Sequence, residues 1–478
     1  MLLIFSGIVA VILYIEGMLL PSLLAISRDF GVTLSQTSLV LALYAVGGTA
    51  LVPVIGKIGD IYGKKKVVTY LLAIYAISVT VTGFSPNFDF MLAARTIQGI
   101  SLAIIPLLLS LVREEFPKEQ VPKATGILNG MYGVGFAISI PLGAWVSNNY
   151  GWRATYHTAI PFVVIFAIVT ILMIKESPFK RPRVKVDYIG AILLGAPLAM
   201  IALALGEGSS WGWTSVDTLA LLTIGILTFI PLILYERMLS RKGGEPILDL
   251  RLLSIRNVMA ANITTILAVV GMILAFQVFI YKFEYPSPVG YGLSIFSAGV
   301  SLLPLALALL IVSPIAGVLA PKTGVKPLGI SGALIGALGF YLSAQAASYN
   351  ELLMSMFIAG IGLAIGMTCT INLLVLSVDV KDMGLATSMN TALKNLGSSV
   401  GAPIGASLLS TFTISLAVGT EGGKTIFAKF PSSAAFQYSF YIAAIVFLLL
   451  AVTILFANEV LGHGKGADLK ERMRAAKE

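Results

Sequence analysis

Three charged side chains lie inside long apolar stretches of this sequence, and their chemistry needs an explanation. Glu16 lies in VILYIEGMLLP, Arg95 in MLAARTIQG and Lys394 in TALKNLG. A charge at the centre of a helix surrounded by hydrocarbon costs roughly 2.5–3.5 kcal/mol on insertion scales. A carboxylate, a guanidinium and an ammonium group in such positions therefore indicate binding or proton transfer.

The composition indicates that the surroundings of these charges are lipid. Of the 478 residues, 57% are hydrophobic and 12% are charged, whereas soluble domains carry about 25% charged residues. The single cysteine excludes an internal disulfide, and two histidines without a Cys/His cluster predict no metal site. The net charge of +9 is spread over loops, so we expect no nucleic-acid partner.

Apolar runs of about twenty residues cross a bilayer as helices, and this sequence has fourteen of them. The first begins at Met1 with no basic residue before it and no small-residue cleavage site, which predicts a retained span. The predicted spans are 2–26, 35–56, 67–85, 88–112, 124–147, 155–174, 188–206, 216–235, 257–281, 292–319, 327–347, 352–376, 385–410 and 436–458.

The distribution of Lys and Arg predicts the orientation of these spans. With the N-terminus inside, most of the 32 basic residues fall in inner loops and in the C-terminal tail. Positive loops stay in the cytoplasm, so both termini are predicted to be cytoplasmic.

The chain repeats itself at an offset of about 261 residues. PVIGKIGDIYGKK (53–65) aligns with PIAGVLAPKTGVK (314–326), and GISLAI (99–104) with GIGLAI (360–365). A third pair aligns at an offset of 262, ATGILNGMYGVGFAISIPLGA (124–144) with ATSMNTALKNLGSSVGAPIGA (386–406). We therefore predict an all-α membrane protein of two six-helix pseudo-repeats. Its parts are an N-terminal half (1–175), a linker with two inserted spans (176–256), a C-terminal half (257–460) and a cytoplasmic tail (461–478).

The segment GKIGDIYGKKK (56–66), between the second and third spans, resembles the signature loop of the major facilitator superfamily. The matching residues are Gly56, Asp60, Gly63, Lys64 and Lys65, while Ile61 stands where an arginine is usual. RTIQG (95–99) resembles the span-four motif of that family. Further stretches resemble its fourteen-span drug:proton antiporters, namely GWRATYHTAIP (151–161), EPILDLRLLSIRN (245–257), SAGVSLLP (297–304) and LKNLGSSVG (393–401).

The resemblance covers nearly the whole chain and implies a transporter that works by alternating access. It implies efflux of amphipathic organic compounds or drugs across the cytoplasmic membrane, driven by the proton gradient, with no cofactor. The implied partners are a small-molecule substrate, protons and membrane lipids, and we expect a monomer. No nucleotide loop, metal cluster or nucleophile elbow supports an enzyme. A non-transporting sensor stays open, although the repeat and Glu16 argue against it.

Span five departs from the antiporter signature, which requires Gly-Pro, two residues and then Gly-Gly. The sequence here is IPLGAW (140–145), in which Pro141 is kept and Ile140, Ala144 and Trp145 replace glycines. The departure leaves the direction of coupling open. The alternative is a proton symporter that imports a small solute or an organic acid, which Lys394 also favours.

Glu16 and Arg95 are predicted to lie at similar depth in spans one and four. A low-dielectric cavity disfavours the charged carboxylate and a nearby arginine favours it, so the group can titrate near neutral pH. We predict that Glu16 carries the coupling proton. Two alternatives stay open, a permanent ion pair that holds the two spans together and a Glu16 that faces lipid head groups. In the second repeat the equivalent residues are Gln277 and Met356.

The remaining candidates are polar or small residues of the spans. The predicted substrate-binding residues are Glu16, Gln98, Asn129, Gln277, Asn372 and Lys394. The asparagines can instead hold helices together, and for Lys394 a structural role is an equal alternative. Predicted gating residues are Gly56, Asp60, Gly63, Lys64, Lys65, Pro141, Gly143, Gly397 and Gly401. In the family the aspartate of the loop acts as a latch, and the alternative for Asp60 is a simple loop residue. The glycines are expected to pack between the two halves.

Overall fold

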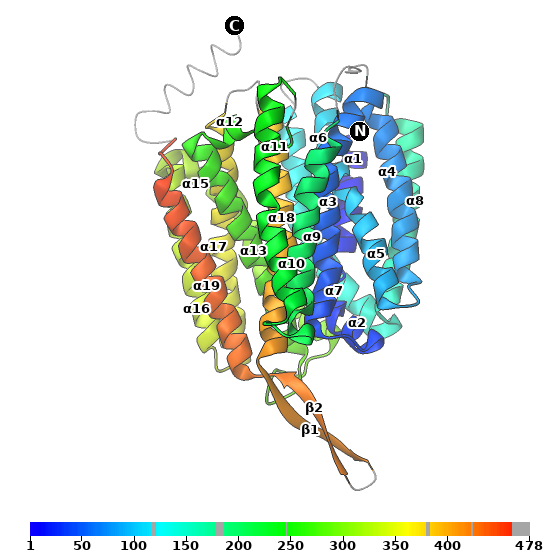
Figure 1. The fold of residues 1–478 in the computed structure, drawn as a ribbon, viewed down its shortest axis with the longest axis vertical. Coiled ribbons are helices and arrows are strands. Elements are labelled where there is room, and N and C mark those ends of the chain that lie inside the picture. Colours follow the sequence, from blue (N-terminus) through cyan, green and yellow to red (C-terminus); the bar gives the residue numbers. More distant parts are fainter. Residues whose placement is uncertain (117–120, 178–185, 245, 379–382, 422–423, 461–478) are drawn as a thin grey trace. The chain divides into compact units, whose positions relative to one another are not determined.

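The computed structural model describes residues 1–116, 121–177, 186–244, 246–378, 383–421 and 424–460, apart from a few side chains within these ranges. Nearly all of these residues are helical (Figure 1). The first part of the chain forms α1 (Leu2–Gly17), η1 (Leu20–Ser22), α2 (Leu23–Phe30), α3 (Leu34–Tyr62), α4 (Lys64–Gly83), α5 (Phe88–Gln98), η2 (Gly99–Ala103), α6 (Ile104–Glu115), α7 (Val121–Tyr150) and α8 (Trp152–Met173).

The remaining elements follow the inserted segment. They are α9 (Tyr188–Trp211), α10 (Val216–Leu227), α11 (Phe229–Arg241), α12 (Leu250–Leu253), α13 (Arg256–Glu284), α14 (Ile295–Ser301), α15 (Leu303–Thr323), α16 (Val325–Gln345), α17 (Tyr349–Val375), α18 (Met383–Thr411), β1 (Thr413–Glu421), β2 (Lys424–Pro431) and α19 (Ser433–Phe456). A helix or a short series of helices covers each predicted span, so the positions of the helices followed correctly from the apolar runs.

Twelve segments of the described residues are long and apolar enough to cross a membrane. The protein is therefore a multi-pass membrane protein. Helices α7 and α18 have 30 and 29 residues but include residues whose side chains lie outside the described part. They are not among the twelve, and the count of fourteen spans stays a prediction.

The chain divides into two compact units, which are described separately. The first contains residues Met1–Ile247, Ile273–Leu303 and Ser398–Ser439, and the second contains Leu248–Met272, Pro304–Gly397 and Phe440–Glu478. This division groups residues by their contacts and not by sequence repeat. The predicted boundaries of the two halves and of the linker therefore stay a prediction.

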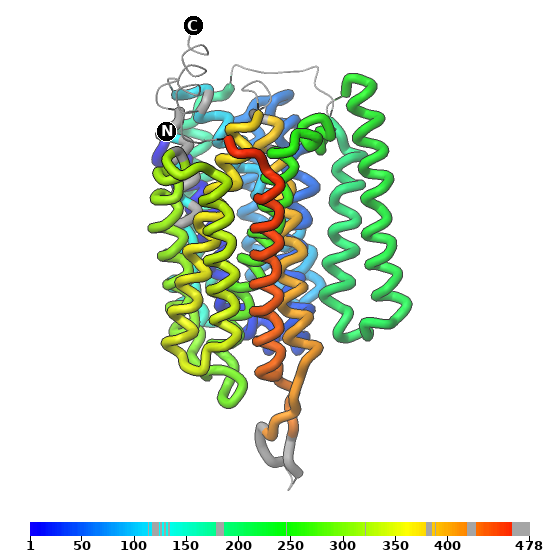
Figure 2. Tube along the Cα trace, turned by 90° about the vertical axis from the view of Figure 1, so that its left-hand side faces the viewer, coloured from blue at the N-terminus to red at the C-terminus, as the bar shows by residue number. Residues whose placement is uncertain are grey.

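The inserted helices belong to the first unit. Helix α9 contacts α3, and it also contacts α10 and α11. Figure 2 shows α9 beside the green helices α10 and α11. Polar bonds hold the end of α9 in place. The carbonyl oxygen of Leu205 accepts hydrogen bonds from Ser35 at 3.1 Å and Ser407 at 2.7 Å, and Gln36 donates to Glu207 at 2.9 Å.

The predicted loop at 56–66 is largely helical, which corrects the sequence interpretation. Helix α3 runs to Tyr62 and α4 begins at Lys64, so Gly63 alone separates them. Its φ of 109° lies in the region that favours glycine, and Gly324 does the same between α15 and α16 with a φ of 92°. A single residue can form each of these turns because glycine, which has no Cβ, adopts a positive φ without steric strain.

A carboxylate caps the helix after each of these turns. The backbone N–H groups of Lys65 and Lys66 both donate to Glu176 at 3.1 Å. Those of Val325 and Lys326 donate in the same way to Glu459 at 3.0 Å. A carboxylate at a helix N-terminus satisfies orphan donors and interacts favourably with the helix dipole.

The antiparallel hairpin of β1 and β2 departs from the all-α prediction. Ile414 pairs with Phe430 and Ser415 with Lys429, and the hairpin projects beyond the end of α18 (Figure 1). The local sequence TISL (413–416) alternates polar and apolar residues, which is the pattern of a strand. The prediction missed it because the neighbouring spans dominated the hydropathy pattern.

Candidate functional site

Arg95 is a fully buried charge of the first unit. Helix α5 places it against α3, where its side chain is 0% exposed and its Nε donates to the carbonyl oxygen of Val40 at 3.1 Å. Its Cζ lies 4.4 Å from the centre of the Tyr44 ring. Within the described part of the chain, neither Nη1 nor Nη2 has a hydrogen-bond partner. Buried guanidinium donors without partners are costly, so these atoms indicate a place for water, an acid or a ligand.

Further polar side chains surround Arg95. Gln98, one turn later, is also 0% exposed, and both of its amide atoms lack hydrogen-bond partners among the described residues. The hydroxyls of Tyr75 on α4 and Tyr156 on α8 also lack hydrogen-bond partners among the described residues. Both tyrosines interact electrostatically with Arg95. The Tyr75 hydroxyl lies near the Gln98 amide without the alignment of a hydrogen bond. We refer to Arg95, Gln98, Tyr44, Tyr75 and Tyr156 as the arginine cluster.

Glu16 lies beside this cluster. Its side chain is half-buried on α1 and interacts electrostatically with Tyr44 and Tyr75, the same two tyrosines that Arg95 affects. Neither terminal nitrogen of Arg95 is hydrogen-bonded within the described structure. The role of Glu16, as proton carrier, as part of a permanent ion pair or facing lipid head groups, stays a prediction. The structure therefore brings the carboxylate and the guanidinium to the same group of tyrosines.

Glycines allow the helices around the cluster to approach closely. A Cβ at Gly99 would lie 2.2 Å from the carbonyl oxygen of Tyr44, and one at Gly47 would lie 2.2 Å from that of Thr96. Such distances exclude any side chain, because the contacting atoms are backbone atoms. The close contact of α3 with α5 holds Arg95 over Tyr44.

The signature residues form a separate ion-pair group. Lys64 donates to Glu114 at 2.6 Å and lies 3.1 Å from Asp60. Lys65 donates through Nζ to the carbonyl oxygen of Ile171 at 2.9 Å, whereas a Cβ at Gly56 would have no atom within 4 Å. The described partner of Asp60 thus belongs to its own repeat, and its role as a latch stays a prediction.

The other predicted binding residues differ in their surroundings. Gln277 on α13 is 0% exposed, and its amide atoms have no hydrogen-bond partner in the described ranges. Asn372 and Lys394 are half-buried, and Lys394 interacts with another residue. The side chain of Asn129 lies outside the described residues. Asn390 donates to Asn262 and Thr265 at 2.9 and 2.8 Å, so it connects two helices.

The predicted gating glycines pack helices in pairs. A Cβ at Gly143 on α7 would lie 2.4 Å from Met18, and one at Gly397 on α18 would lie 2.8 Å from the carbonyl oxygen of Ile266 on α13. Gly401 is buried and Pro141 is half-buried within α7. These contacts join α7 to the end of α1 and α18 to α13. The expected role of the glycines between the two halves stays a prediction.

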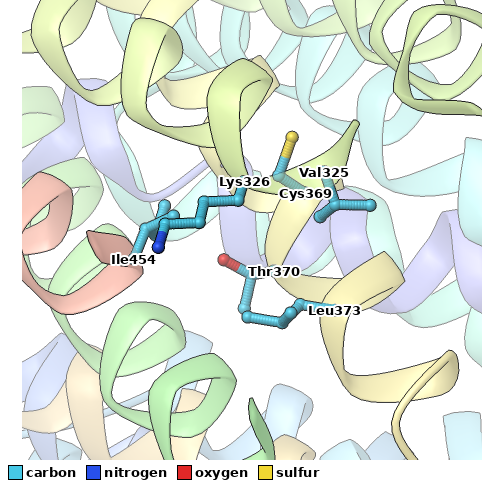
Figure 3. A pocket seen from close by; sticks show the side chains of 6 residues that line it. All are labelled: Val325, Lys326, Cys369, Thr370, Leu373 and Ile454. Carbon is cyan, nitrogen blue, oxygen red and sulfur yellow. The ribbon is translucent and has the colours of Figure 1, made fainter. Parts of the chain in front are cut away.

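The recess in the second unit is not a suitable substrate site. Figure 3 shows the side chains that line this recess of roughly 200 Å³. The recess is too narrow to hold a water molecule. The lining is mostly apolar and includes Val325, Leu373 and Ile454. The arginine cluster remains the better candidate because it offers polar atoms without partners.

Sequence reasoning missed the tyrosines of the cluster and the burial of Glu284. Tyr75 and Tyr156 are single aromatic residues in apolar spans, where tyrosine is common. Glu284 is only 8% exposed, although it is the last residue of α13. The only signal in the sequence for these three residues is a tyrosine or a carboxylate on the buried face of a predicted helix.

Comparison with known proteins identifies the family. The model of the Major Facilitator Superfamily matches residues 5–402 and 305–472, and the chain belongs to this family. The chain is 25% identical over 397 residues to the multidrug resistance protein Stp of Mycobacterium tuberculosis (strain CDC 1551 / Oshkosh), covering 81% of this chain and 71% of Stp. It is 26% identical over 374 residues to the multidrug transporter protein MdtP of Bacillus subtilis (strain 168), covering 77% and 67%.

Solved structures agree on the fold. A D-xylose-proton symporter superposes with a TM-score of 0.65 at 15% identity, covering 96% of this chain and 98% of the symporter. The nucleoside transporter NupG gives a TM-score of 0.64 at 12% identity, covering 95% and 98%. The protein is a membrane transporter with a small-molecule substrate, and not an enzyme.

Proposed function

We propose that this transporter exports amphipathic organic compounds, among them lipophilic cations, in exchange for protons. The observation that carries the proposal is the arginine cluster with Glu16 beside it. Glu16 is a half-buried carboxylate, and the nearby guanidinium of Arg95 has two donors without hydrogen-bond partners in the described residues. Two relatives whose names refer to multidrug resistance or transport support the choice of substrates.

The arrangement suits a carboxylate that changes its protonation state. Desolvation favours the neutral acid, while the positive charge of Arg95 favours the carboxylate. The two effects act on Glu16 through the same low-dielectric surroundings, so a small movement of either helix changes their balance. A permanent, fully bonded ion pair would lack this sensitivity.

In the proposed cycle, deprotonated Glu16 accepts the substrate from the cytoplasm. The protein then opens outward by alternating access, and protonation of Glu16 releases the substrate. The return of the protonated form carries one proton inward.

We propose that the protein lies in the cytoplasmic membrane with fourteen spans, in which α7 and α18 join the twelve segments identified above. Both termini lie in the cytoplasm in this arrangement. The support is the excess of Lys and Arg in the loops on that side. The end of α13 at Glu284 then faces outward.

The test uses purified protein in liposomes that contain a pH-sensitive dye and experience an inward proton gradient. Lipophilic cations and organic anions are added in turn to the wild type and to Glu16→Gln. We expect cations to trigger proton movement in the wild type, and we expect Glu16→Gln to abolish it. The exposed residue Asp217 provides a matched control, Asp217→Asn, which should behave like the wild type.

Other outcomes would change the proposal in defined ways. Proton movement that continues in Glu16→Gln would exclude Glu16 as the carrier. Protons that move in the same direction as an added anion would turn the interpretation to the symporter.

A further inference from the structure

The last nine residues of α13 and the adjoining Tyr285, FQVFIYKFEY (276–285), combine aromatic rings with one acid. Three polar side chains of this segment are buried, Gln277 at 0%, Tyr281 at 0% and Glu284 at 8% exposure. The two amide atoms of Gln277, the Tyr281 hydroxyl and Oε1 of Glu284 all lack hydrogen-bond partners among the described residues. Four such atoms on one short segment are unusual in a native interior.

These side chains share one face of the helix. Residues 277, 281 and 284 are separated by four and three positions, the spacing at which helical side chains lie above one another. They extend over about 10 Å of the helix axis. The Tyr281 hydroxyl lies near the Gln277 amide without the alignment of a hydrogen bond. We refer to the three residues as the polar ladder.

Aromatic rings surround the ladder. Phe276 stacks on Phe136 of α7 with centroids 6.2 Å apart, and the rings of Tyr281 and Tyr285 are 6.3 Å apart. Tyr285 also contacts Phe430 of β2 edge-on at 5.9 Å, so the hairpin begins beside the ladder. Burial raises the pKa of the Tyr285 hydroxyl, which therefore remains a donor.

The basic residues nearby leave the carboxylate available. Lys282 points elsewhere, because its Nζ donates to the carbonyl oxygen of Val289 at 2.7 Å and lies over the ring of Phe436. Arg28 on α2 is exposed and influences Glu284 electrostatically, but no ion pair joins the two among the described residues. A buried acid without a bonded partner attracts a cation.

We propose that Glu284, Tyr281 and Gln277 form a second binding site for the cationic group of an organic substrate, near the end of α13. The carboxylate would contact the positive charge, the tyrosine and glutamine oxygens would orient it, and the aromatic rings would hold its apolar part. Aromatic faces and a carboxylate are the combination that recognises organic ammonium and phosphonium ions. Since α13 ends on the outer side in the proposed orientation, the site would receive the substrate on its way out.

This inference rests on the proposed export of cations, and the test separates the two. Purified protein in nanodiscs is titrated with radiolabelled tetraphenylphosphonium, and proton exchange is measured in liposomes with the same probe. We expect Glu284→Gln to weaken binding about tenfold and Tyr281→Phe about threefold, because charge-assisted contacts are roughly twice as strong as neutral ones. Glu284→Asp should stay within about threefold of the wild type, because it keeps the charge. The control Asp217→Asn should bind like the wild type.

Each outcome decides the proposal. Tetraphenylphosphonium binding that is unchanged in both Glu284→Gln and Tyr281→Phe would overturn the site while leaving proton exchange intact. A wild type that neither binds the probe nor exchanges protons for it would overturn the proposed function itself. If Glu284→Gln does not elute as a folded monodisperse protein, Tyr281→Phe and Glu284→Asp decide, since equal binding by Tyr281→Phe and the wild type would contradict the ladder.

Discussion

The region from span two to span four occurs twice in this protein, and the two copies share their backbone contacts. Gly63 and Gly324 form the same one-residue turn, and Glu176 and Glu459 cap the helices that follow. A Cβ at Gly99 would meet the carbonyl oxygen of Tyr44, and one at Gly360 would meet that of Leu305 at 3.1 Å. Tyr44 and Leu305 are themselves related by the offset of 261 residues.

The polar chemistry, by contrast, occurs only in the first copy. At the same offset Arg95 corresponds to Met356, Gln98 to Ala359 and Tyr75 to Gly336. The small residues of the second copy let α16 and α17 touch, since a Cβ at Gly339 would lie 2.3 Å from the backbone nitrogen of Ala359. Close glycine contacts between helices therefore occur in both copies of this region. The charged and polar residues of the proposed site occur only in its first copy.

The largest expected effect comes from making the first copy like the second at Arg95. Arg95→Met should reduce cation-driven proton movement at least about hundredfold, because the neighbouring charge that favours the Glu16 carboxylate is removed. The melting temperature should stay equal or rise, because an apolar residue in place of a buried charge is often neutral or stabilising by about 1–4 kcal/mol. Transport assays and thermal unfolding measure the two quantities. A variant that unfolds readily but transports normally when folded would show that Arg95 is structural.

The next effect concerns the shared glycine contacts. Gly99→Val should destabilise the protein by about 3 kcal/mol or more, because its Cβ would overlap a backbone oxygen that cannot move. Gly360→Val should cost less, since its nearest atom is the Cβ of Ala308 at 2.7 Å. The yield after size-exclusion chromatography and the melting temperature show which of the two variants loses more stability. Equal losses in both variants would contradict the difference in contact distance.

A smaller effect is expected at the ion-pair group that the second copy lacks. Lys64 corresponds to Val325, and Glu114 to Val375. Lys64→Met should lower the free energy of unfolding by about 2 kcal/mol, because it leaves the partly buried Glu114 carboxylate without its cation. The loss of the contact with Asp60 should contribute little, because Asp60 is more exposed. Lys66→Met in the same helical turn is the control, since Lys66 is exposed. Similar melting temperatures for the two variants would show that the ion pairs contribute nothing to stability.

The smallest expected effect tests the capping carboxylates that the two copies share. Glu176→Gln and Glu459→Gln should each cost about 1 kcal/mol, because an amide oxygen accepts hydrogen bonds without the charge that favours the helix dipole. Each variant is the control of the other, and their apparent melting temperatures should fall by about 1–2 °C. A large loss in one alone would show that the two caps are not equivalent.

Hydropathy was sufficient to place the helices. Runs such as 35–56 and 352–376 predicted α3 and α17 within a few residues at most ends. Glu16 and Arg95 stood out because charge is rare in such runs, and Gln277 followed from the repeat. The hairpin at 413–431 was missed, because two short alternating strands give a weaker signal than a span. The helical course of 56–62 was missed because glycine and charge are also typical of loops.

The sequence alone determined that this chain is a membrane protein with internal sequence repeats, because apolar run length and internal offsets are properties of the linear order. It also determined which charges would be costly, since residue type and position in a span are enough for that. Only the tertiary structure decided which polar atoms have partners. Tyr75, Tyr156 and Glu284 became relevant only in the folded chain, because burial and hydrogen bonding depend on neighbours far away in the sequence.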